Sequence, residues 1–270
     1  MQKDKTQTNA CALVTGATGG LGKAFAFELA KRGYTLLLTG RSLDKLTALQ
    51  TELSEKYPKI STWVYPADLS DIASRNKLME NIKTAGFKIS LLANVAGADI
   101  QKALADYTQE KIAFQCRVNL EAAIAFSRFA IENRDKRLEI INVSSVSGIY
   151  PMPYFAIYSA TKAALTSFSV ALRKELKGQN AAVTAILPGA MPTREDIKAQ
   201  IRGQGLWGRL AAKSPNQVAE CALKAVRKNK KKPIVGFWNK VMRISTAWIP
   251  TSWKLHFIAK RWSKISKDAF

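Results

Sequence analysis

A glycine-rich turn between an apolar run and a helical pattern constrains the fold more than any other feature of this sequence. The apolar run at residues 10–14 leads into Thr15–Gly22, and a helical pattern follows. Gly16 permits a tight turn, Gly20 lets backbone approach a pyrophosphate, and Gly22 lets the helix pack closely on the strand. The helix N-terminus favours negative charge. The segment therefore predicts a dinucleotide site in an α/β fold; taken alone, it also fits a flavodoxin-like glycine turn.

A tyrosine and a lysine four residues apart are the second informative feature. On a helix, Tyr158 and Lys162 share one face, so the phenol and the ammonium converge. A free tyrosine titrates near about 10, and a fixed cation beside it favours the phenolate and lowers its pKa. Ser145, at the end of an apolar run, could orient a carbonyl against Tyr158. The three residues predict proton-transfer chemistry, whereas a Tyr-x-x-x-Lys pair alone also fits an exposed helix face.

Together with Asn119, these motifs resemble the short-chain dehydrogenase/reductase family of NAD(P)-dependent enzymes over residues 11–235. The resemblance implies a Rossmann-like, doubly wound parallel sheet of about seven strands, with helices on both faces. A chain of 270 residues with 47% hydrophobic content can bury such a core, and we expect one reductase domain at residues 1–235. In the family, an asparagine at this position kinks its helix and positions the lysine through an ordered water. The implied catalytic residues are Asn119, Ser145, Tyr158 and Lys162.

The residue that follows the second predicted strand, Tyr34–Thr39, bears on the choice of cofactor. An NAD-selective site places a carboxylate there for the ribose 2′-hydroxyl, whereas this chain has Arg41. A guanidinium suits a 2′-phosphate by its charge and by its fork of donors. We therefore predict NADP(H) rather than NAD(H). Two alternatives stay open. The protein could use both cofactors, or Arg41 could be a solvated cation of the loop with no role in cofactor binding.

The resemblance implies further cofactor contacts. Asp68 takes the position that holds the adenine amino group, and its alternative role is to cap the helix that starts near Ile72. The run Asn94–Gly97 departs from the family's Asn-Asn-Ala-Gly at Val95, which leaves its other three residues to shape the wall beside the adenosine. The full predicted set of cofactor contacts is Gly16, Thr18, Gly20, Leu21, Gly22, Arg41, Asp68, Leu69, Asn94, Ala96, Gly97, Tyr158, Lys162, Pro188, Gly189, Met191 and Thr193.

An apolar, proline-stiffened segment at residues 148–155 predicts a hydrophobic substrate. Its aromatic residues would wall a pocket beside the tyrosine, although core packing explains them equally well. Residues 194–213 are rich in glycine and apolar side chains, which is typical of a lid that closes on a substrate. The predicted substrate contacts are Ser145, Tyr150, Phe155 and Tyr158.

These features predict an NADP(H)-dependent oxidoreductase that reduces a carbonyl of a small hydrophobic substrate to an alcohol. Steroids, acyl chains and long-chain ketones fit this description. Hydride transfer would be coupled to Tyr158 as general acid/base. The alternative is a non-catalytic NADP(H)-binding regulatory or scaffold protein. The absence of Tyr158 or Lys162 would have indicated such a protein, but both are present. The resemblance also implies a homodimer or homotetramer that packs through the helix at residues 158–176.

Residues 236–270 form an extension with its own composition. The chain carries 42 Lys+Arg against 20 Asp+Glu, and thirteen of these cations lie between Lys224 and Lys267, where no acid occurs. Four of the six tryptophans lie in the extension. Tryptophan together with lysine and arginine is typical of a membrane interface, so we predict that two short helices, broken at Pro250, contact an anionic membrane surface. The alternative is an arm that folds over its own active site or across a dimer.

The sequence disfavours several other classes of protein. No RNP, helix-turn-helix or zinc pattern accompanies the net charge of +22, so nucleic acid is not an expected partner. Cys11, Cys116 and Cys221 lack disulfide or metal spacing, and no metal is expected. No apolar run approaches the about 20 residues of a membrane span, and residues 1–5 lack a signal-peptide pattern. We therefore predict a cytoplasmic protein, peripheral at the membrane.

Overall fold

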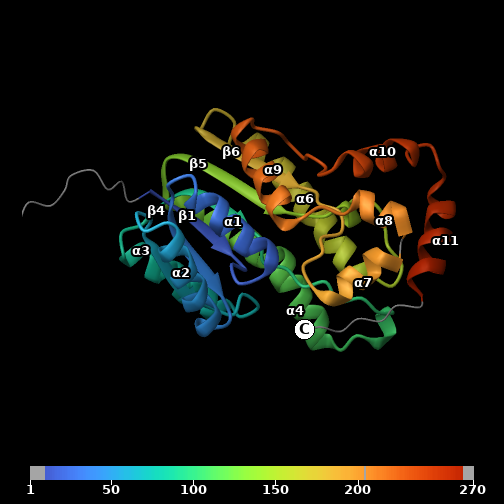
Figure 1. The fold of residues 1–270 in the computed structure, drawn as a ribbon, viewed down its shortest axis with the longest axis horizontal. Helices are drawn as coiled ribbons and strands as arrows, with labels where there is room; N and C mark the ends of the chain where they lie inside the picture. Colours follow the sequence, from blue (N-terminus) through green and yellow to red (C-terminus); the bar gives the residue numbers. More distant parts are fainter. Residues whose placement is uncertain (1–9, 204, 264–270) are drawn as a thin grey trace, which may run out of the picture.

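A single parallel β-sheet organises the molecule. The structure is a computed structural model, and it describes residues 10–203 and 205–263. Its six strands lie in the order β3-β2-β1-β4-β5-β6, with the crossover from one half to the other between β1 and β4 (Figure 1). Every neighbouring pair is parallel, which confirms the predicted doubly wound α/β sheet. The strands are β1 (Ala10–Thr15), β2 (Thr35–Gly40), β3 (Thr62–Pro66), β4 (Lys88–Asn94), β5 (Arg134–Val143) and β6 (Ala181–Ile186).

Helices cover both faces of this sheet, which explains why its strands are continuously apolar rather than alternating. On one face, α1 (Gly20–Ala30), α2 (Leu43–Lys56) and α9 (Pro215–Arg227) enclose a core with β2 residues Leu36 and Leu38. On the other face, Leu37 points into a second core with α3 (Ile72–Thr84), α5 (Ala122–Glu132) and α6 (Ala156–Glu175). Both apolar layers are therefore buried, as successive strand side chains point to opposite faces.

Residues 233–235, which lie where a seventh strand of the expected sheet would run, form only one parallel bridge. Ile234 pairs with Leu187, whose amide donates to the carbonyl of Pro233 at 3.0 Å, while the amide of Val235 donates to Leu187 at 3.0 Å. Pro233 has no N–H for a longer ladder. Gly236, at φ +92°, then turns the chain away from the sheet. Six strands, not seven, make up the sheet.

The helix that carries Asn119 consists of three parts. It runs as α4 (Gln109–Cys116), a π-helical turn η2 (Arg117–Glu121) and α5. Asn119 lies in the π-helical turn, at the position where the sequence predicts a kink. Such bulges widen the helix locally and occur often at functional sites.

Four helices lie beyond the carboxyl ends of the strands, on the right of Figure 1. They are α7 (Glu195–Gly203), α8 (Gly205–Ala211), α10 (Phe237–Ser245) and α11 (Thr251–Trp262). Pro250 separates α10 from α11, as the sequence predicts. Ser214 caps α9 in a reciprocal capping box with Gln217, with Pro215 at the first helical position. Within the described ranges, no helix combines the length and the apolarity needed to cross a membrane.

α10 is anchored to the rest of the protein by a buried asparagine. The amide nitrogen of Asn239 donates to the carbonyls of Ala211 at 3.0 Å and Val235 at 2.7 Å. A Cβ on Gly189 would come within 2.6 Å of the same nitrogen, so only glycine leaves room for it. The first helix of the extension therefore packs directly on the loop that follows β6.

Candidate active site

One cavity of about 740 Å³ lies at the carboxyl edge of the sheet, where the loops after all six strands meet. It collects nearly all of the predicted site residues. Of the predicted cofactor contacts, only Asn94 does not line it; of the predicted catalytic residues, only Asn119 does not. All of the predicted substrate contacts are present. The predicted residues that line it are Gly16, Thr18, Gly20, Leu21, Gly22, Arg41, Asp68, Leu69, Ala96, Gly97, Ser145, Tyr150, Phe155, Tyr158, Lys162, Pro188, Gly189, Met191 and Thr193.

The glycine turn after β1 leaves an open cradle at one end of this cavity. Gly16 adopts φ +65°, and a Cβ there would lie 2.8 Å from the Cα of Ala96. A Cβ on Gly22 would overlap the carbonyl oxygen of Gly16. Gly19, at the N-cap of α1, offers no side chain to cap the helix. The uncapped N-terminus of α1 thus faces the cavity, an arrangement that suits the negative charge of a pyrophosphate.

Tyr158 and Lys162 lie on one turn of α6, next to Ser145 at the end of β5. The Lys162 Nζ lies 5.6 Å from the centre of the Tyr158 ring and donates to the Val143 carbonyl at 2.9 Å. The Ser145 hydroxyl lies beside the Tyr158 phenol, and as a hydrogen-bond partner it lowers the pKa of Tyr158. The Ser145 hydroxyl also accepts the amide of Ser147 at 3.1 Å, which holds it at the cavity. The phenol, the ammonium and the hydroxyl therefore converge as the sequence predicts.

The pKa values at this cluster follow burial more than charge pairing. Burial raises the pKa of Tyr158 above its usual value near 10, and the charge of Asp99 raises it further. The Ser145 hydrogen bond and the charge of Arg194 act in the opposite direction. Burial lowers the pKa of Lys162 to about 8. The predicted lowering of the Tyr158 pKa is therefore wrong in its net direction, because loss of hydration raises that pKa and keeps the phenol protonated.

Asn119 lies behind the cavity wall. Its side-chain oxygen accepts the amide of Ala98 at 2.7 Å, and its nitrogen donates to the Ala98 carbonyl at 2.9 Å and to the Thr161 hydroxyl at 3.2 Å. A Cβ on Gly97 would lie 3.3 Å from both the Asn119 oxygen and the Lys162 Nζ. Asn119 thus joins the loop after β4 to the catalytic helix. Its predicted part in a proton path stays a prediction.

Arg41 and Asp68 lie at the end of the cavity opposite the catalytic cluster. Arg41 is exposed, and its guanidinium carbon lies 6.0 Å from the centre of the Phe114 ring. Burial raises the pKa of Asp68, but hydrogen bonds from Ser70 and the charge of Arg41 lower it overall. The helix-capping role left open for Asp68 belongs to Asp71, whose carboxylate accepts the amide of Ser74 at 2.9 Å.

The side chain of Asn94 does not reach the cavity, contrary to its predicted contact. Its nitrogen donates to the Ala123 carbonyl at 3.1 Å, the Ser127 hydroxyl at 3.3 Å and the Asn142 side chain at 2.8 Å. Asn94 is the last residue of β4, and its side chain points into the layer of α5. It ties β4 to β5 and α5, while the following residue Val95 lines the cavity instead.

The end of the cavity that holds the predicted substrate contacts is built of stacked rings. Phe155 stacks on Tyr158 with ring centres 4.2 Å apart, and Trp262 of α11 stacks on Phe155 at 6.2 Å. The Tyr150 hydroxyl is hydrogen-bonded to Thr246 at 2.9 Å, so this predicted substrate contact also fastens the turn between α10 and α11. α7 and α8 contribute to the wall as the predicted lid segment.

Several cavity residues have no signal in the sequence motifs. An ion pair crosses the cavity wall between Asp99 and Arg194, with the guanidinium donating to both carboxylate oxygens at 3.0 Å. The extension supplies a further group: Met242, Arg243, Ile258 and Trp262, together with Asn239. Among these residues, only Arg194 could have been predicted at the cavity, because it directly follows Thr193, the last predicted cofactor contact. These contacts agree with the alternative stated for the extension, in which it folds over its own active site.

The sequence of residues 10–202 matches a protein family described as short chain dehydrogenase. The chain belongs to the short chain dehydrogenase family. Among curated proteins, this short chain dehydrogenase is 35% identical to the very-long-chain 3-oxoacyl-CoA reductase of Bos taurus, over 68% of this chain and 60% of that protein. It is 32% identical to the 17-beta-hydroxysteroid dehydrogenase type 3 of Homo sapiens, over 67% of this chain and 59% of that protein. The match thus spans about three fifths of the length of these relatives.

Among solved structures, the L-sorbose reductase from Gluconobacter frateurii, complexed with NADPH and L-sorbose, has a TM-score of 0.76 against this short chain dehydrogenase. The sequences are 23% identical, and the match covers 84% of this chain and 94% of the other. At this level of identity, the likeness shows the shared fold.

Proposed function

We propose that this protein is an NADP(H)-dependent reductase of hydrophobic carbonyl compounds. The observation that carries the proposal is one continuous cavity with a phosphate cradle at one end and a half-buried proton donor at the other. The cradle is formed at Gly16–Gly22, and the donor is the Tyr158 phenol beside Ser145 and Lys162. A nucleotide cofactor and a carbonyl compound can thus meet inside the same cavity.

The residues of the cavity fit NADP(H). The positions that glycine leaves open, the uncapped N-terminus of α1 and the exposed Arg41 together offer a place for a pyrophosphate and a 2′-phosphate. Pro188, Met191 and Thr193 line the same cavity, and Thr193 lies against Gly20 of the cradle, so this loop would contact a bound cofactor. When bound, NADPH supplies a hydride to the carbonyl carbon. The L-sorbose reductase complex with NADPH supports this choice within the shared fold.

The protein's own side chains supply the proton and the orientation. Tyr158 donates its phenolic proton to the carbonyl oxygen, and Ser145 holds that oxygen in place by a hydrogen bond. Because burial raises the Tyr158 pKa, the phenol is in its acid form before each reduction. Lys162, kept in place by Val143, supplies positive charge beside the phenolate that remains. Asn119 holds the backbone that carries these groups.

The substrate class follows from the apolar end of the cavity. Met152, Phe155, Ile258 and Trp262 line it, and they suit a large hydrophobic group beside the carbonyl. The curated relatives are named for 3-oxoacyl-CoA and hydroxysteroid substrates, which are both bulky and hydrophobic. We therefore favour an acyl or steroid carbonyl over a small polar sugar.

Substitution of the proton donor tests this function. Tyr158→Phe should lower kcat about 10²–10⁴-fold, because the ring remains and only the acidic proton is lost. Binding of NADPH, followed by nicotinamide fluorescence, should be retained. Tyr154→Phe is the matched control, since Tyr154 lines a different cavity, and it should keep its turnover. Equal kcat values for the two variants would rule out Tyr158 as the general acid.

A non-catalytic NADP(H)-binding regulator is the second candidate. It would bind NADPH, yet no ketone of a substrate panel would oxidise the cofactor. The intact phenol, hydroxyl and ammonium at one point favour catalysis, because binding alone does not require a proton donor. A homodimer or homotetramer and a cytoplasmic location stay predictions; sedimentation velocity of the full chain tests the first of these.

A further inference from the structure

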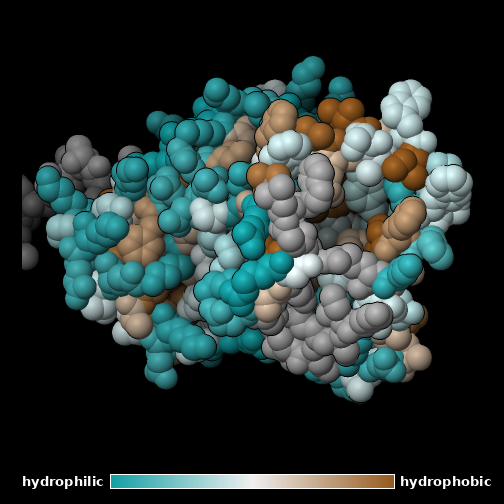
Figure 2. All heavy atoms as spheres, turned by 45° about the vertical axis from the view of Figure 1, so that its right-hand side comes forward, coloured by the Kyte–Doolittle hydropathy of each residue, from teal (hydrophilic) through white to brown (hydrophobic). Residues whose placement is uncertain are grey.

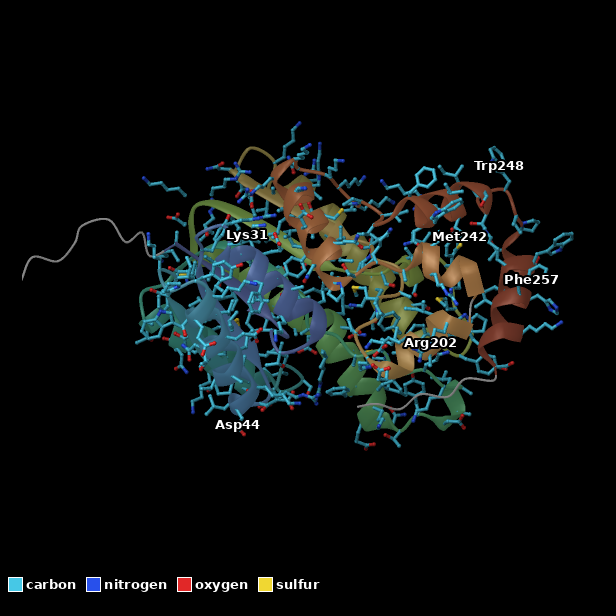
Figure 3. All side chains as sticks on the ribbon, viewed as in Figure 1. Lys31, Asp44, Arg202, Met242, Trp248 and Phe257 are labelled. Carbon is cyan, nitrogen blue, oxygen red and sulfur yellow. The ribbon has the colours of Figure 1, made fainter. Side chains whose placement is uncertain are left out.

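Exposed apolar side chains are concentrated on the last two helices of the described chain. We call residues 237–262, which comprise α10, α11 and the turn between them, the cap. Of the twelve large hydrophobic residues that are exposed within the described ranges, seven belong to the cap. Trp248 is 92% exposed, and it projects outward from the turn in Figure 3, with Phe257 on α11 nearby. The seven are Phe237, Met242, Ile244, Trp248, Ile249, Trp253 and Phe257.

The opposite side of the cap is part of the active-site cavity. Ile258 and Trp262 line it, and Trp262 ends the stack of rings that starts at Tyr158. Asn239 anchors α10, and the hydrogen bond between Tyr150 and Thr246 anchors the turn. The cap is thus a folded part of the molecule with two faces. One face lines the cavity, and the other exposes aromatic rings to the outside.

The charges of the cap are of one sign. Between Lys224 and Ser263 the sequence contains no Asp or Glu. Lys240 and Lys260 are exposed on the cap. Arg243 and Lys254 line a second cavity, of about 230 Å³, between the cap and the loop that carries Tyr150. The cap therefore carries exposed rings and exposed cations with no acid on the same segment, and Figure 2 shows brown and pale side chains gathered on this side of the molecule.

This combination fits the surface of an anionic bilayer. Tryptophan and phenylalanine rings partition to the head-group level, and lysines pair with lipid phosphates. With 9 and 12 residues, α10 and α11 are too short to span about 30 Å of hydrocarbon, so they would lie along the surface. A second copy of the chain is a poorer occupant, because a symmetric contact would bring its cations against these cations.

We propose that the outer face of the cap docks on an anionic lipid bilayer, and that a hydrophobic carbonyl substrate passes from the bilayer into the cavity beside Ile258 and Trp262. The docking stands on the residues of the cap alone. The substrate passage rests on the proposed function.

Vesicle co-sedimentation of the full chain tests the docking, without cofactor or substrate. The vesicles are phosphatidylcholine alone or mixed with phosphatidylserine. Trp248→Ser combined with Phe257→Ser removes exposed rings outside the active-site cavity, and Lys240→Glu combined with Lys260→Glu reverses two cations. The controls are Leu43→Ser with Ile72→Ser, and Lys31→Glu with Lys59→Glu, which alter exposed residues of the other half of the molecule. Circular dichroism checks that each variant is folded.

We expect the full chain to sediment with anionic vesicles at low salt. Each surface cation contributes about 1 kcal/mol, or about fivefold in partition coefficient, so the double reversal should weaken binding at least about 20-fold. Both control variants should bind within about twofold of the full chain if local contacts decide binding. A full chain that stays in solution would overturn the docking. If the cap and control variants lose vesicle binding equally, net charge alone accounts for binding, and the docking proposal would also be wrong.

A self-association interface would give a different result. The cap variants would then change the sedimentation coefficient of the protein without vesicles, and the proposal would be wrong. The passage of substrate has its own readout. With an active enzyme, the ring variant should keep its turnover of a water-soluble ketone and lose turnover of a ketone held in anionic vesicles. Equal turnover of both ketones would refute the passage and leave the docking result intact, and an inactive enzyme would refute the proposed function alone.

Discussion

At the scale of single residues, the active site is governed by the burial of groups that carry protons. Tyr158 and Lys162 are close enough to interact, yet each is also removed from water. Loss of hydration favours the neutral form of both. The result is a protonated phenol beside a lysine whose pKa of about 8 lies within reach of physiological pH. For a reductase this is a useful pairing, since the acid must hold its proton until the carbonyl accepts it.

The buried lysine predicts a pH-dependent stability. Its pKa is about 8 in the folded chain and 10.5 when unfolded, so between these values the unfolded chain binds more protons. Stability should therefore rise with pH over this window, by at most about 3 kcal/mol. Lys162→Met removes the titration. Its stability advantage over the wild type, measured by urea unfolding, should shrink from pH 8 to 10.5. Lys174→Met, on the exposed side of α6, is the control and should show no such trend.

The choice of cofactor also rests on one residue. Arg41→Asp should reverse or erase a preference for NADPH over NADH, because the carboxylate repels a 2′-phosphate and accepts a bond from a 2′-hydroxyl. The measurement is kcat/KM for both cofactors. Lys45→Asp changes the charge by the same amount on neighbouring α2, outside the cavity, and should keep the preference. Equal kcat/KM values for both cofactors in the wild type would contradict the assignment of Arg41.

At the scale of elements, the carboxyl edge of the sheet is closed by segments from two distant parts of the sequence. The loop after β4 supplies Asp99, the start of α7 lies beside Arg194, and the ion pair joins them. α10 then packs on the loop after β6 through Asn239. The cavity therefore depends on contacts between elements, and each contact is a place where the wall can be loosened without a change to the catalytic groups.

Loss of the Asn239 side chain should loosen that wall. Asn239→Ala leaves the carbonyls of Ala211 and Val235 without their donor, which should cost about 1–3 kcal/mol in the free energy of unfolding. Because α10 lines the substrate end, KM for a hydrophobic ketone should rise more than kcat falls. Urea unfolding and steady-state kinetics measure the two effects. Asn81→Ala, at an exposed position of α3, should change neither.

At the scale of the whole molecule, the α/β core and the cap form a continuous structure. The loops of the sheet carry the glycine-lined end of the cavity, and the cap completes its aromatic end. The strong net charge of +22 is uneven, because residues 224–267 contribute thirteen cations and no acid. One side of the molecule is thus suited to a surface of negative charge, while the cavity opens beside it.

This continuity predicts that the cap and the core unfold together. Four of the six tryptophans lie in residues 236–270, so tryptophan fluorescence reports mainly on the extension, whereas far-ultraviolet circular dichroism reports on all helices. The two urea transitions should coincide for the full chain. A fluorescence transition at lower urea would mean that the extension detaches first, as a separate unit.

The sequence by itself determined what depends on neighbours along the chain. Glycine spacing at residues 16–22 predicted the cradle, because only backbone without Cβ fits there. The interval from Tyr158 to Lys162 predicted a shared helix face, and Pro250 predicted the break between α10 and α11. The alternation of apolar strands and helical patterns, with the resemblance, predicted the parallel sheet.

Only the tertiary structure decided what depends on packing between distant segments. Asn94 turned towards α5, because the direction of a side chain at a strand end is set by the helix layer beside it. The raised pKa of Tyr158 arose from burial, which no spacing of residues reports. Asp99 and Arg194, and the ring stack that ends at Trp262, came together across 95 and 104 positions of the chain. Desolvation and long-range contact exist only once the chain has packed, so a linear pattern leaves them undetermined.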